Sequence, residues 1–202
     1  TRDVDVSRFH MELAEQYEGE LVVIPLGPLT NIARTLREYP GFAKKVKRLV
    51  MMGGTLNMGG NVSPVSEANV ACDPRACDEV FVSGMDITAV GLDVTMRTRL
   101  KMEHLDWLAG CCRPACRPAV DYMRQAMVHY LKGNQTQNYC MGDCPLHDPL
   151  AVMCAVVPSL VRTESRKARV ECGGTYCRGM IVTDLREHPF QAEYVRFAVE
   201  VD

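Results

Sequence analysis

The feature that most constrains the fold of this chain is the alternation of short apolar runs with segments of helical periodicity. The apolar runs are nearly continuous, as in Leu21–Ile24, which is typical of strands buried on both faces of a parallel sheet. In the first half, the predicted strands are Glu20–Pro25, Lys47–Met52 and Ile87–Leu92, and the predicted helices are Phe9–Tyr17, Ile32–Glu38 and Asp73–Ser83. A repeated order of strand, turn and helix favours a parallel sheet with right-handed crossovers.

Polar residues mark where two of these helices should begin. Thr30 or Asn31 is expected to cap the helix that follows the first strand. Asp73 is expected to cap a later helix, with Pro74 at its first position.

The second half of the chain is predicted to be helical first and rich in strands towards its end. The predicted helices are Glu103–Ala109, Pro118–Leu131 and Leu150–Val157, and the predicted strands are Ala168–Glu171, Gly179–Val182 and Val195–Val201. The pair Gly173-Gly174 indicates a hairpin turn. The whole pattern predicts an α/β fold, a mainly parallel sheet flanked by helices, in a single domain over residues 1–202.

Composition excludes several classes of partner. The chain has 202 residues, of which 47% are hydrophobic, enough to bury one core. Its formal net charge of −2 gives no electrostatic reason to expect nucleic acid or an anionic membrane. No run of about 20 apolar residues occurs, and Thr1–Asp5 does not read as a signal peptide.

The ten cysteines favour reduced thiols and a cytoplasmic protein over a secreted disulfide framework. Cys72, Cys77 and Cys154 lie in predicted helices among apolar residues and are interpreted as core residues. An alternative function of another class, a zinc- or thiol-dependent protein, would use the three ligand types in Cys140-x3-Cys144-x2-His147. That spacing lacks a second ligand pair, so the zinc reading is the weaker one.

The loop after the strand that ends at Met52 carries a set of polar side chains. Gly53-Gly54 breaks the strand, and the following loop includes Asn61, Glu67 and Asn69. Side chains at the carboxyl ends of strands face the ligand crevice of an α/β sheet. Carboxamide and carboxylate groups are suited to hydrogen-bond a polyhydroxylated ligand such as a sugar.

A second candidate site is the run His147-Asp148-Pro149. Pro149 at a helix start predicts Asp148 as the N-cap, with its carboxylate at the positive end of the helix dipole. Such a carboxylate stays ionised and can bind a hard cation or sugar hydroxyls, and His147 beside it can donate a proton. Taken alone, the run favours a plainer interpretation, a capped helix with a surface histidine and no functional site.

Six segments then occur in one order along the chain. They are Gly27–Asn31, Val50–Gly54, Gly60–Asn69, Asp73-Pro74, Val90–Thr95 and His147–Pro149. In order and spacing, from about Leu21 to Val201, the chain resembles the inosine-uridine-preferring nucleoside hydrolase family. Six matching segments in sequence are far more specific than any one of them.

The resemblance implies an activity and a cofactor. Members of the family cleave the N-glycosidic bond of ribonucleosides to ribose and a free base, which belongs to nucleoside metabolism and purine salvage. A calcium ion binds the attacking water and the ribose 2′ and 3′ hydroxyls. By the family pattern, Asp148 and the backbone carbonyl of Leu26 are calcium ligands in this chain. The family also implies a nucleoside as partner and a homo-oligomer.

The resemblance also assigns roles around the substrate. Asn61, Glu67 and Asn69 are implied to hold the ribose, together with Asp148, and Met52 lines the pocket. His147 resembles the acid that protonates the leaving base, a step that typically contributes about 10²–10⁴-fold to the rate. The base preference is not fixed by these residues.

One part of the family pattern is missing. The N-terminal acidic motif Asp-x-Asp-x-x-x-Asp-Asp, which supplies most calcium ligands and the general base, does not occur, since Asp3 and Asp5 lack an acidic pair after them. We therefore expect an internal and C-terminal portion of the family fold, truncated at both ends, that is inactive by itself. A catalytically inactive nucleoside-binding relative is the alternative function.

Overall fold

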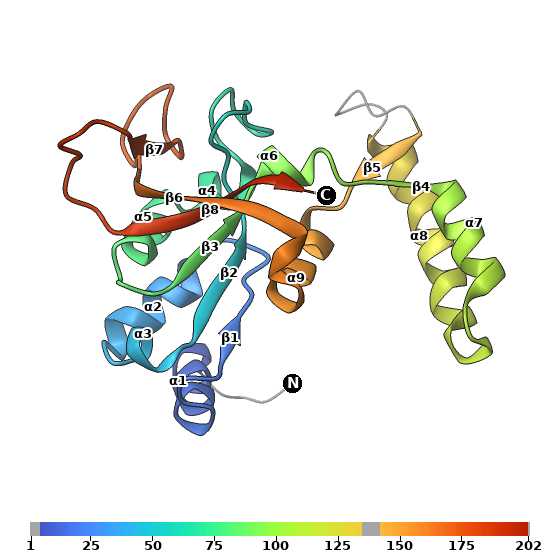
Figure 1. The fold of residues 1–202 in the computed structure, drawn as a ribbon, viewed down its shortest axis with the longest axis horizontal. Coiled ribbons are helices and arrows are strands. Elements are labelled where there is room, and N and C mark those ends of the chain that lie inside the picture. Colours follow the sequence, from blue (N-terminus) through green and yellow to red (C-terminus); the bar gives the residue numbers. More distant parts are fainter. Residues whose placement is uncertain (1–4, 135–141, 202) are drawn as a thin grey trace. The chain divides into compact units, whose positions relative to one another are not determined.

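The computed structural model of the chain describes residues 5–134 and 142–201. They form two compact units, one from Thr1–Thr95 with His147–Asp202 and one from Met96–Leu146. Figure 1 shows the elements of both units, and each unit is described here by itself. The expectation of a single domain stays a prediction.

The larger unit is built on a six-stranded sheet in the order β1-β2-β3-β8-β6-β7. β1, β2, β3 and β8 run parallel to one another, whereas β6 is antiparallel to both β8 and β7. The strands are β1 (Val22–Val23), β2 (Arg48–Met52), β3 (Ile87–Val90), β6 (Val161–Val170), β7 (Ile181–Asp184) and β8 (Tyr194–Val201). The mainly parallel sheet expected from the sequence is confirmed.

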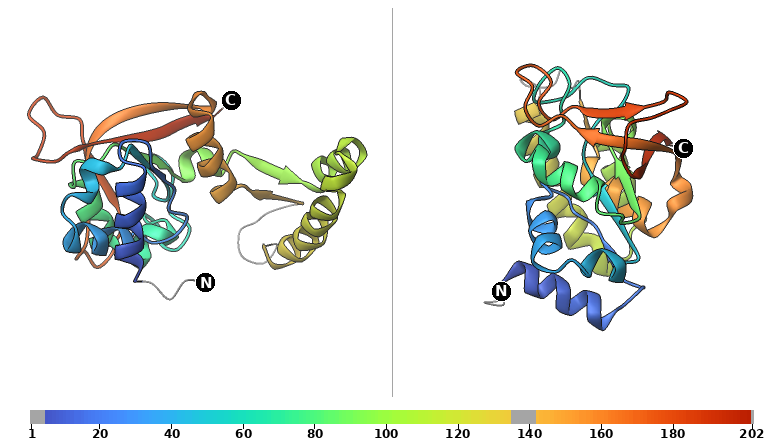
Figure 2. Two further views of the ribbon diagram at one scale, coloured as in Figure 1. Left: turned by 90° about the horizontal axis from the view of Figure 1, so that it is seen from below. Right: turned by 90° about the vertical axis from the view of Figure 1, so that its left-hand side faces the viewer.

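Helices cover both faces of this sheet, as Figures 1 and 2 show. They are α1 (Val6–Gln16), α2 (Thr30–Glu38), α3 (Phe42–Lys45), α4 (Ala68–Cys72), α5 (Pro74–Phe81), α6 (Leu92–Thr95) and α9 (His147–Val156), with the 3-10 turn η2 (Pro158–Leu160) after α9. Leu49 and Met51 of β2 point into the main core with Phe42 and Phe81. Arg48, on the other face of β2, donates to the Ala155 carbonyl oxygen of α9 at 2.6 Å.

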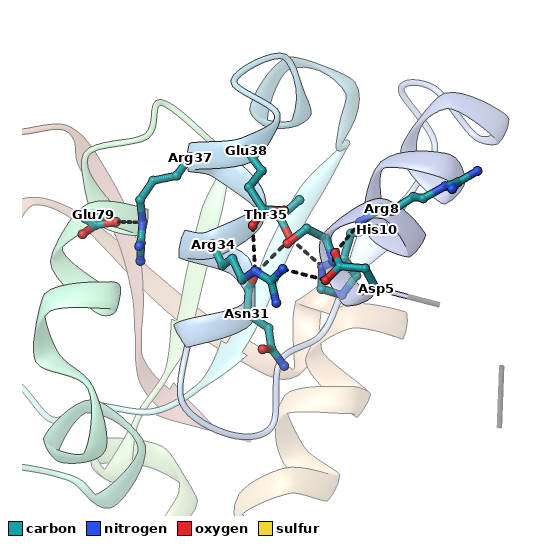
Figure 3. A network of polar contacts seen from close by, with 10 residues as sticks. Asp5, Arg8, His10, Asn31, Arg34, Thr35, Arg37, Glu38 and Glu79 are labelled. Atoms are coloured by element: carbon teal, nitrogen blue, oxygen red, sulfur yellow. Dashed lines mark hydrogen bonds and ion pairs between the residues drawn. The ribbon is translucent and has the colours of Figure 1, made fainter. Parts of the chain in front are cut away.

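Polar contacts fix α1 against α2, as Figure 3 shows. Arg34 of α2 bonds Asp5, the N-cap residue of α1, at 2.6 Å and Glu38 at 2.7 Å. His10 of α1 lies with Nδ1 2.9 Å from Thr35 Oγ1. Burial lowers the pKa of His10. The contacts of Asp5 with Arg34 and of His10 with Thr35 therefore hold α1 against α2.

The smaller unit is a helical pair closed by a short ribbon. It contains β4 (Arg99–Lys101), α7 (Met102–Cys111), the 3-10 turn η1 (Pro114–Cys116), α8 (Arg117–Asn134) and β5 (Asp143–Pro145). β4 and β5 pair antiparallel, and Arg99 Nε lies 3.1 Å from Asp143 Oδ1. Across the helices, Arg124 forms an ion pair with Asp106 at 2.5 Å.

The structure corrects several predicted boundaries. The helix predicted to start at Ile32 begins at Thr30, and its N-cap is Leu29, so neither Thr30 nor Asn31 is the cap. The strand predicted over Ile87–Leu92 ends at Val90, because Thr95 N bonds the Gly91 carbonyl and the chain turns into α6. Three- to five-residue elements such as β4, β5, α4 and α6 carry too little periodicity to be predicted.

Two further corrections concern β6 and the cysteines. β6 runs over Val161–Val170, longer than the predicted Ala168–Glu171, because its charged residues pair across the sheet and hide the apolar pattern; one such pair is Arg162 with Glu200. Cys72, interpreted as a core residue, is exposed, since it lies at the end of the short helix α4. Cys77 and Cys154 are buried, as predicted. In residues 5–134 and 142–201, no helix has the length and apolarity that a membrane crossing requires.

Candidate active site at the strand ends

The carboxyl ends of β1, β2 and β3 are joined by backbone hydrogen bonds. Met52 N donates to the Pro25 carbonyl at 3.0 Å, which ties the end of β2 to the end of β1. Gly53 N donates to the Val90 carbonyl at 3.2 Å, and Leu92 N donates to the Gly54 carbonyl at 2.9 Å. The three turns that follow these strands therefore form one rigid rim, where an α/β sheet binds ligands.

Glycine is required where two of these turns meet. A Cβ on Gly91 would lie 2.5 Å from the Gly54 carbonyl oxygen, and Gly54 itself has φ +81°. A side chain at Gly91 would therefore separate the turns after β2 and β3, and one at Gly54 would strain the backbone.

Gly91→Ala is expected to lower the free energy of unfolding by about 1–3 kcal/mol, the usual cost of forcing extra atoms into a packed site. Gly41→Ala is the control, because a Cβ at Gly41 meets nothing within 4 Å. Urea unfolding of both variants measures the difference. Equal stabilities for the two variants would contradict the tight approach of the turns.

Glu67 links the end of β2 to the start of α4. It is the N-cap residue of α4, and its side chain accepts from Asn69 N at 2.9 Å and from Val70 N at 3.3 Å. Its Oε2 also accepts from Gly54 N at 2.9 Å, and the residue is only 2% exposed. A carboxylate offers about four lone-pair sites, so three backbone donors leave room for one further donor such as a sugar hydroxyl.

Burial raises the pKa of the Glu67 carboxyl, the three backbone hydrogen bonds partly offset this, and the negative charge of Asp148 raises it further. Since the folded-state pKa lies above the unfolded value of 4.5, the contribution of this group to stability is full below pH 4.5. It is lost as the pH rises through the folded-state pKa, because the folded state then holds a buried anion.

We therefore expect wild type to lose stability relative to Glu67→Gln, which mimics the protonated acid, as the pH rises from 4.5 towards neutrality. The free energies of unfolding of both proteins, measured in urea across this range, test the sign. A gap that moves in favour of wild type with rising pH would show that the backbone donors outweigh burial.

Asn69 gathers three groups from two strand ends. Its Nδ2 lies 3.0 Å from the Met52 carbonyl oxygen, 3.3 Å from Met52 Sδ and 3.5 Å from the Leu26 carbonyl oxygen. Met52 is buried, whereas Leu26 is exposed. The structure thus brings Leu26, Met52 and Asn69 together.

Asn61 lies at the start of the same loop. Its Oδ1 accepts from Ala68 N at 3.0 Å, and Ala68 is the first residue of α4. This bond fixes the loop back onto the helix that carries Asn69. The Asn61 residue is exposed, so its remaining amide hydrogens face solvent.

His147 and Asp148 begin α9. The helix starts at His147, so Asp148 lies in its first turn and is not the N-cap that the sequence predicts. Pro149 occupies the third helical position, where it also sacrifices no helix hydrogen bond. His147 Nδ1 lies 2.8 Å from Oγ1 of Thr95, the last residue of α6, which follows β3. Asp148 is exposed and its charge acts on Glu67.

Two residues at the rim were not identified from the sequence as contributors to the site. Asp93 is 5% exposed and accepts from Leu56 N and Asn57 N, both at 2.8 Å, which anchors the loop that leads to Asn61. Thr95 is the partner of His147. Both lie in Val90–Thr95, one of the six segments that resemble the family. The resemblance indicated this region of the chain but did not predict these two contacts.

A hollow opens beside the Leu26 carbonyl. It is lined by Val23–Pro28 with His10, Asn31 and Ile32. A ligand that reached this carbonyl would lie at the end of β1, next to the amide of Asn69.

The described residues do not form a complete metal site. Calcium takes about six to eight oxygen ligands, and Leu26 and Asp148 would supply one carbonyl and one carboxylate. Across residues 5–134 and 142–201, no group of three or more His, Cys, Asp or Glu side chains is arranged to hold a metal ion. Of the alternative zinc ligands, Cys140 lies outside the described residues, and Cys144 is buried.

Known proteins are similar to this chain in sequence and in fold. A family model described as inosine-uridine preferring nucleoside hydrolase matches residues 2–202. Uridine nucleosidase 1 of Arabidopsis thaliana is 35% identical over 178 residues, which is 88% of this chain and 51% of that protein.

Two solved structures are also similar. A plant nucleoside hydrolase superposes with a TM-score of 0.90 at 30% sequence identity. The superposition covers 99% of this chain and 63% of the chain of the plant enzyme. A purine-preferring ribonucleoside hydrolase from Gardnerella vaginalis superposes with a TM-score of 0.89 at 34% sequence identity. The superposition covers 100% of this chain and 62% of the chain of that hydrolase.

The mainly parallel sheet and the polar rim at its carboxyl edge define an α/β protein with a candidate ligand site at the strand ends. The chain belongs to the inosine-uridine preferring nucleoside hydrolase family. It spans about half the length of the curated relatives it matches.

Proposed function

We propose that the protein containing this chain hydrolyses the N-glycosidic bond of ribonucleosides to ribose and a free base. The observation that carries the proposal is the cluster of Leu26, Met52 and Asn69 at the strand ends. In a member of this family, such a cluster of two backbone carbonyls and a carboxamide suits the hydroxyl groups of a ribose.

Ribose recognition falls to the loop and to α4. Asn61, Glu67 and Asn69 each have hydrogen-bonding capacity beyond the backbone bonds they make, and Asp148 adds a carboxyl group at the start of α9. Held by several hydroxyl contacts, the sugar ring can be kept in a pucker that favours the oxocarbenium-like transition state.

His147 is the proposed leaving-group acid. When the glycosidic C–N bond breaks, its electron pair stays on the nitrogen of the base, and His147 supplies a proton to the base. This neutralises the leaving group and typically contributes about 10²–10⁴-fold. Water attacks the ribosyl carbon and loses a proton to a base that is not among the described residues.

Calcium would supply activation of the water and orientation of the sugar. Leu26 and Asp148 are proposed as two of its ligands, and the other oxygens have to come from outside the described residues. The described residues therefore contribute to the rate through their contacts with the ribose hydroxyls and through His147. Homo-oligomerisation and a cytoplasmic location stay predictions.

The base preference is open, because one relative is named a uridine nucleosidase and another a purine-preferring hydrolase. A second candidate function, a nucleoside-binding relative without catalysis, is favoured by one observation: the acidic motif does not occur in these residues. The two candidates differ in turnover and not in binding.

The test is a reducing-sugar assay with inosine, uridine and other nucleosides, using the longest polypeptide that the gene encodes around these residues. Release of ribose that requires added calcium supports the hydrolase. Nucleoside binding by calorimetry without any ribose release supports the non-catalytic relative instead.

A further inference from the structure

The larger unit holds two buried threonines whose hydroxyl groups each meet a histidine nitrogen, and their surroundings differ. Thr35 Oγ1 donates to the Asn31 carbonyl at 2.8 Å and lies 2.9 Å from His10 Nδ1 (Figure 3). A hydroxyl has one proton to donate. Because Thr35 gives it to the carbonyl, Thr35 can only accept from His10, so His10 carries its ring proton on Nδ1.

The hydroxyl of Thr95, unlike that of Thr35, can donate its proton to the histidine. Its Oγ1 lies 2.8 Å from His147 Nδ1, and the residue is 0% exposed. Within the described part of the chain, its hydroxyl makes no bond to a carbonyl, so its proton can go to His147 Nδ1. An imidazole that accepts at Nδ1 carries its proton on Nε2.

The backbone around Thr95 holds this hydroxyl in place. Thr95 N donates to the Gly91 carbonyl at 3.1 Å, and Leu92 N donates to the Gly54 carbonyl at 2.9 Å. Asp93, between them, accepts two backbone bonds from the loop after β2. All four residues of α6 are buried, so Thr95 has little freedom to move away from His147.

We propose that Thr95 is a positioning residue for His147: it donates to Nδ1, fixes the ring orientation and leaves the proton on Nε2 for the departing base. This inference rests on the proposed function for its role in the reaction. In the step, His147 acts as the imidazolium, after its Nδ1 has taken a second proton from solvent and donates it in a hydrogen bond to Thr95 Oγ1. The C–N electron pair goes to the base nitrogen, the Nε2 proton follows it, and His147 is left as a neutral imidazole. Thr95 holds the ring in both states, because a hydroxyl can both donate and accept.

The structural half of the proposal is tested by NMR on the full chain of residues 1–202. Long-range ¹H–¹⁵N spectra at about pH 8, where an ordinary histidine is neutral, report which ring nitrogen carries the proton, and His147→Gln assigns the signal among five histidines. Wild type and Thr95→Ser should show His147 protonated on Nε2. Thr95→Val, which keeps the shape and removes the hydroxyl, should show a mixture of tautomers.

Thr35→Val is the matched control, because it removes the hydroxyl of the other pair. It should change the signal of His10 and leave that of His147 unchanged. A His147 signal with the proton on Nδ1 in wild type, or one that Thr95→Val does not alter, overturns the proposal.

The functional half is tested by kinetics on the longest gene product. Thr95→Val should lower kcat for inosine at least about tenfold, part of the usual effect of a general acid, with KM within about twofold. Thr95→Ser should restore kcat, and hydrolysis of p-nitrophenyl riboside should be little affected, since p-nitrophenolate leaves without a proton. An equal loss on both substrates contradicts the role in positioning the acid.

The two tests separate this inference from the proposed function. If the gene product releases no ribose from any nucleoside, the proposed function fails, and the NMR result still decides whether Thr95 sets the tautomer of His147.

Discussion

Residues 1–202, produced as an isolated polypeptide, are expected to release ribose from inosine or uridine more than about 10⁴-fold more slowly than a family member that carries the acidic motif. Loss of the general base alone costs about 10²–10⁴-fold, and the metal contribution is lost as well. The reason is chemical: these residues contain no Asp-x-Asp-x-x-x-Asp-Asp sequence. In residues 5–134 and 142–201, moreover, no group of three or more His, Cys, Asp or Glu side chains is arranged to hold a metal ion such as calcium.

The measurement is a reducing-sugar assay over hours at high protein concentration, in the presence of calcium. The matched comparison is the longest polypeptide of the same gene, if it encodes the motif ahead of these residues. Turnover by the isolated residues within about a hundredfold of that polypeptide would contradict the account of the general base.

Asp148→Ala is expected to lower kcat/KM of the longest gene product by about 10²–10⁴-fold. A hydrogen bond to a charged group contributes about 1.5–3 kcal/mol, and a carboxylate that binds two ribose hydroxyls makes two of them. At about 1.4 kcal/mol for each factor of ten, the loss is two to four orders of magnitude.

Asp86→Ala is the control for this variant. Asp86 is an exposed carboxylate that pairs with Arg196 at the start of β3, the opposite end of the strand from the candidate site. Exposed ion pairs contribute about 0–1 kcal/mol, so activity should stay close to wild type. Equal activities of the Asp148 and Asp86 variants would show that Asp148 does not bind the substrate.

The parallel sheet could be predicted because its strands carry their own signal. The apolar residues of β2 and β3, such as Leu49–Met52 and Ile87–Val90, are buried on both faces, and continuous apolar runs are typical of such strands. β6 was only partly predicted, because charged residues that pair across strands resemble a solvated segment. The start of α9 was placed three residues late, at Leu150 instead of His147, since Pro149 is compatible with more than one position in the first turn.

The sequence predicted which segments of the chain contribute to the candidate site, but it did not predict the hydrogen bonds between their side chains. The sequence identified Asn69 and Met52, but their meeting at 3.0 Å depends on how the loop folds back onto β2. Asp93 and Thr95 gave no signal of their own, because their partners lie 36 to 52 residues away in the sequence. Long-range hydrogen bonds follow from tertiary packing, which local periodicity does not encode.

The central claim is that a ribose binds at the carboxyl ends of β1, β2 and β3. A crystal structure of the longest gene product with a bound ribonucleoside tests it most directly. The account predicts ribose hydroxyls within hydrogen-bonding distance of Asn69 and Asp148, with the base next to His147. A nucleoside bound elsewhere on the protein, with this rim unoccupied at saturating ligand, would contradict it.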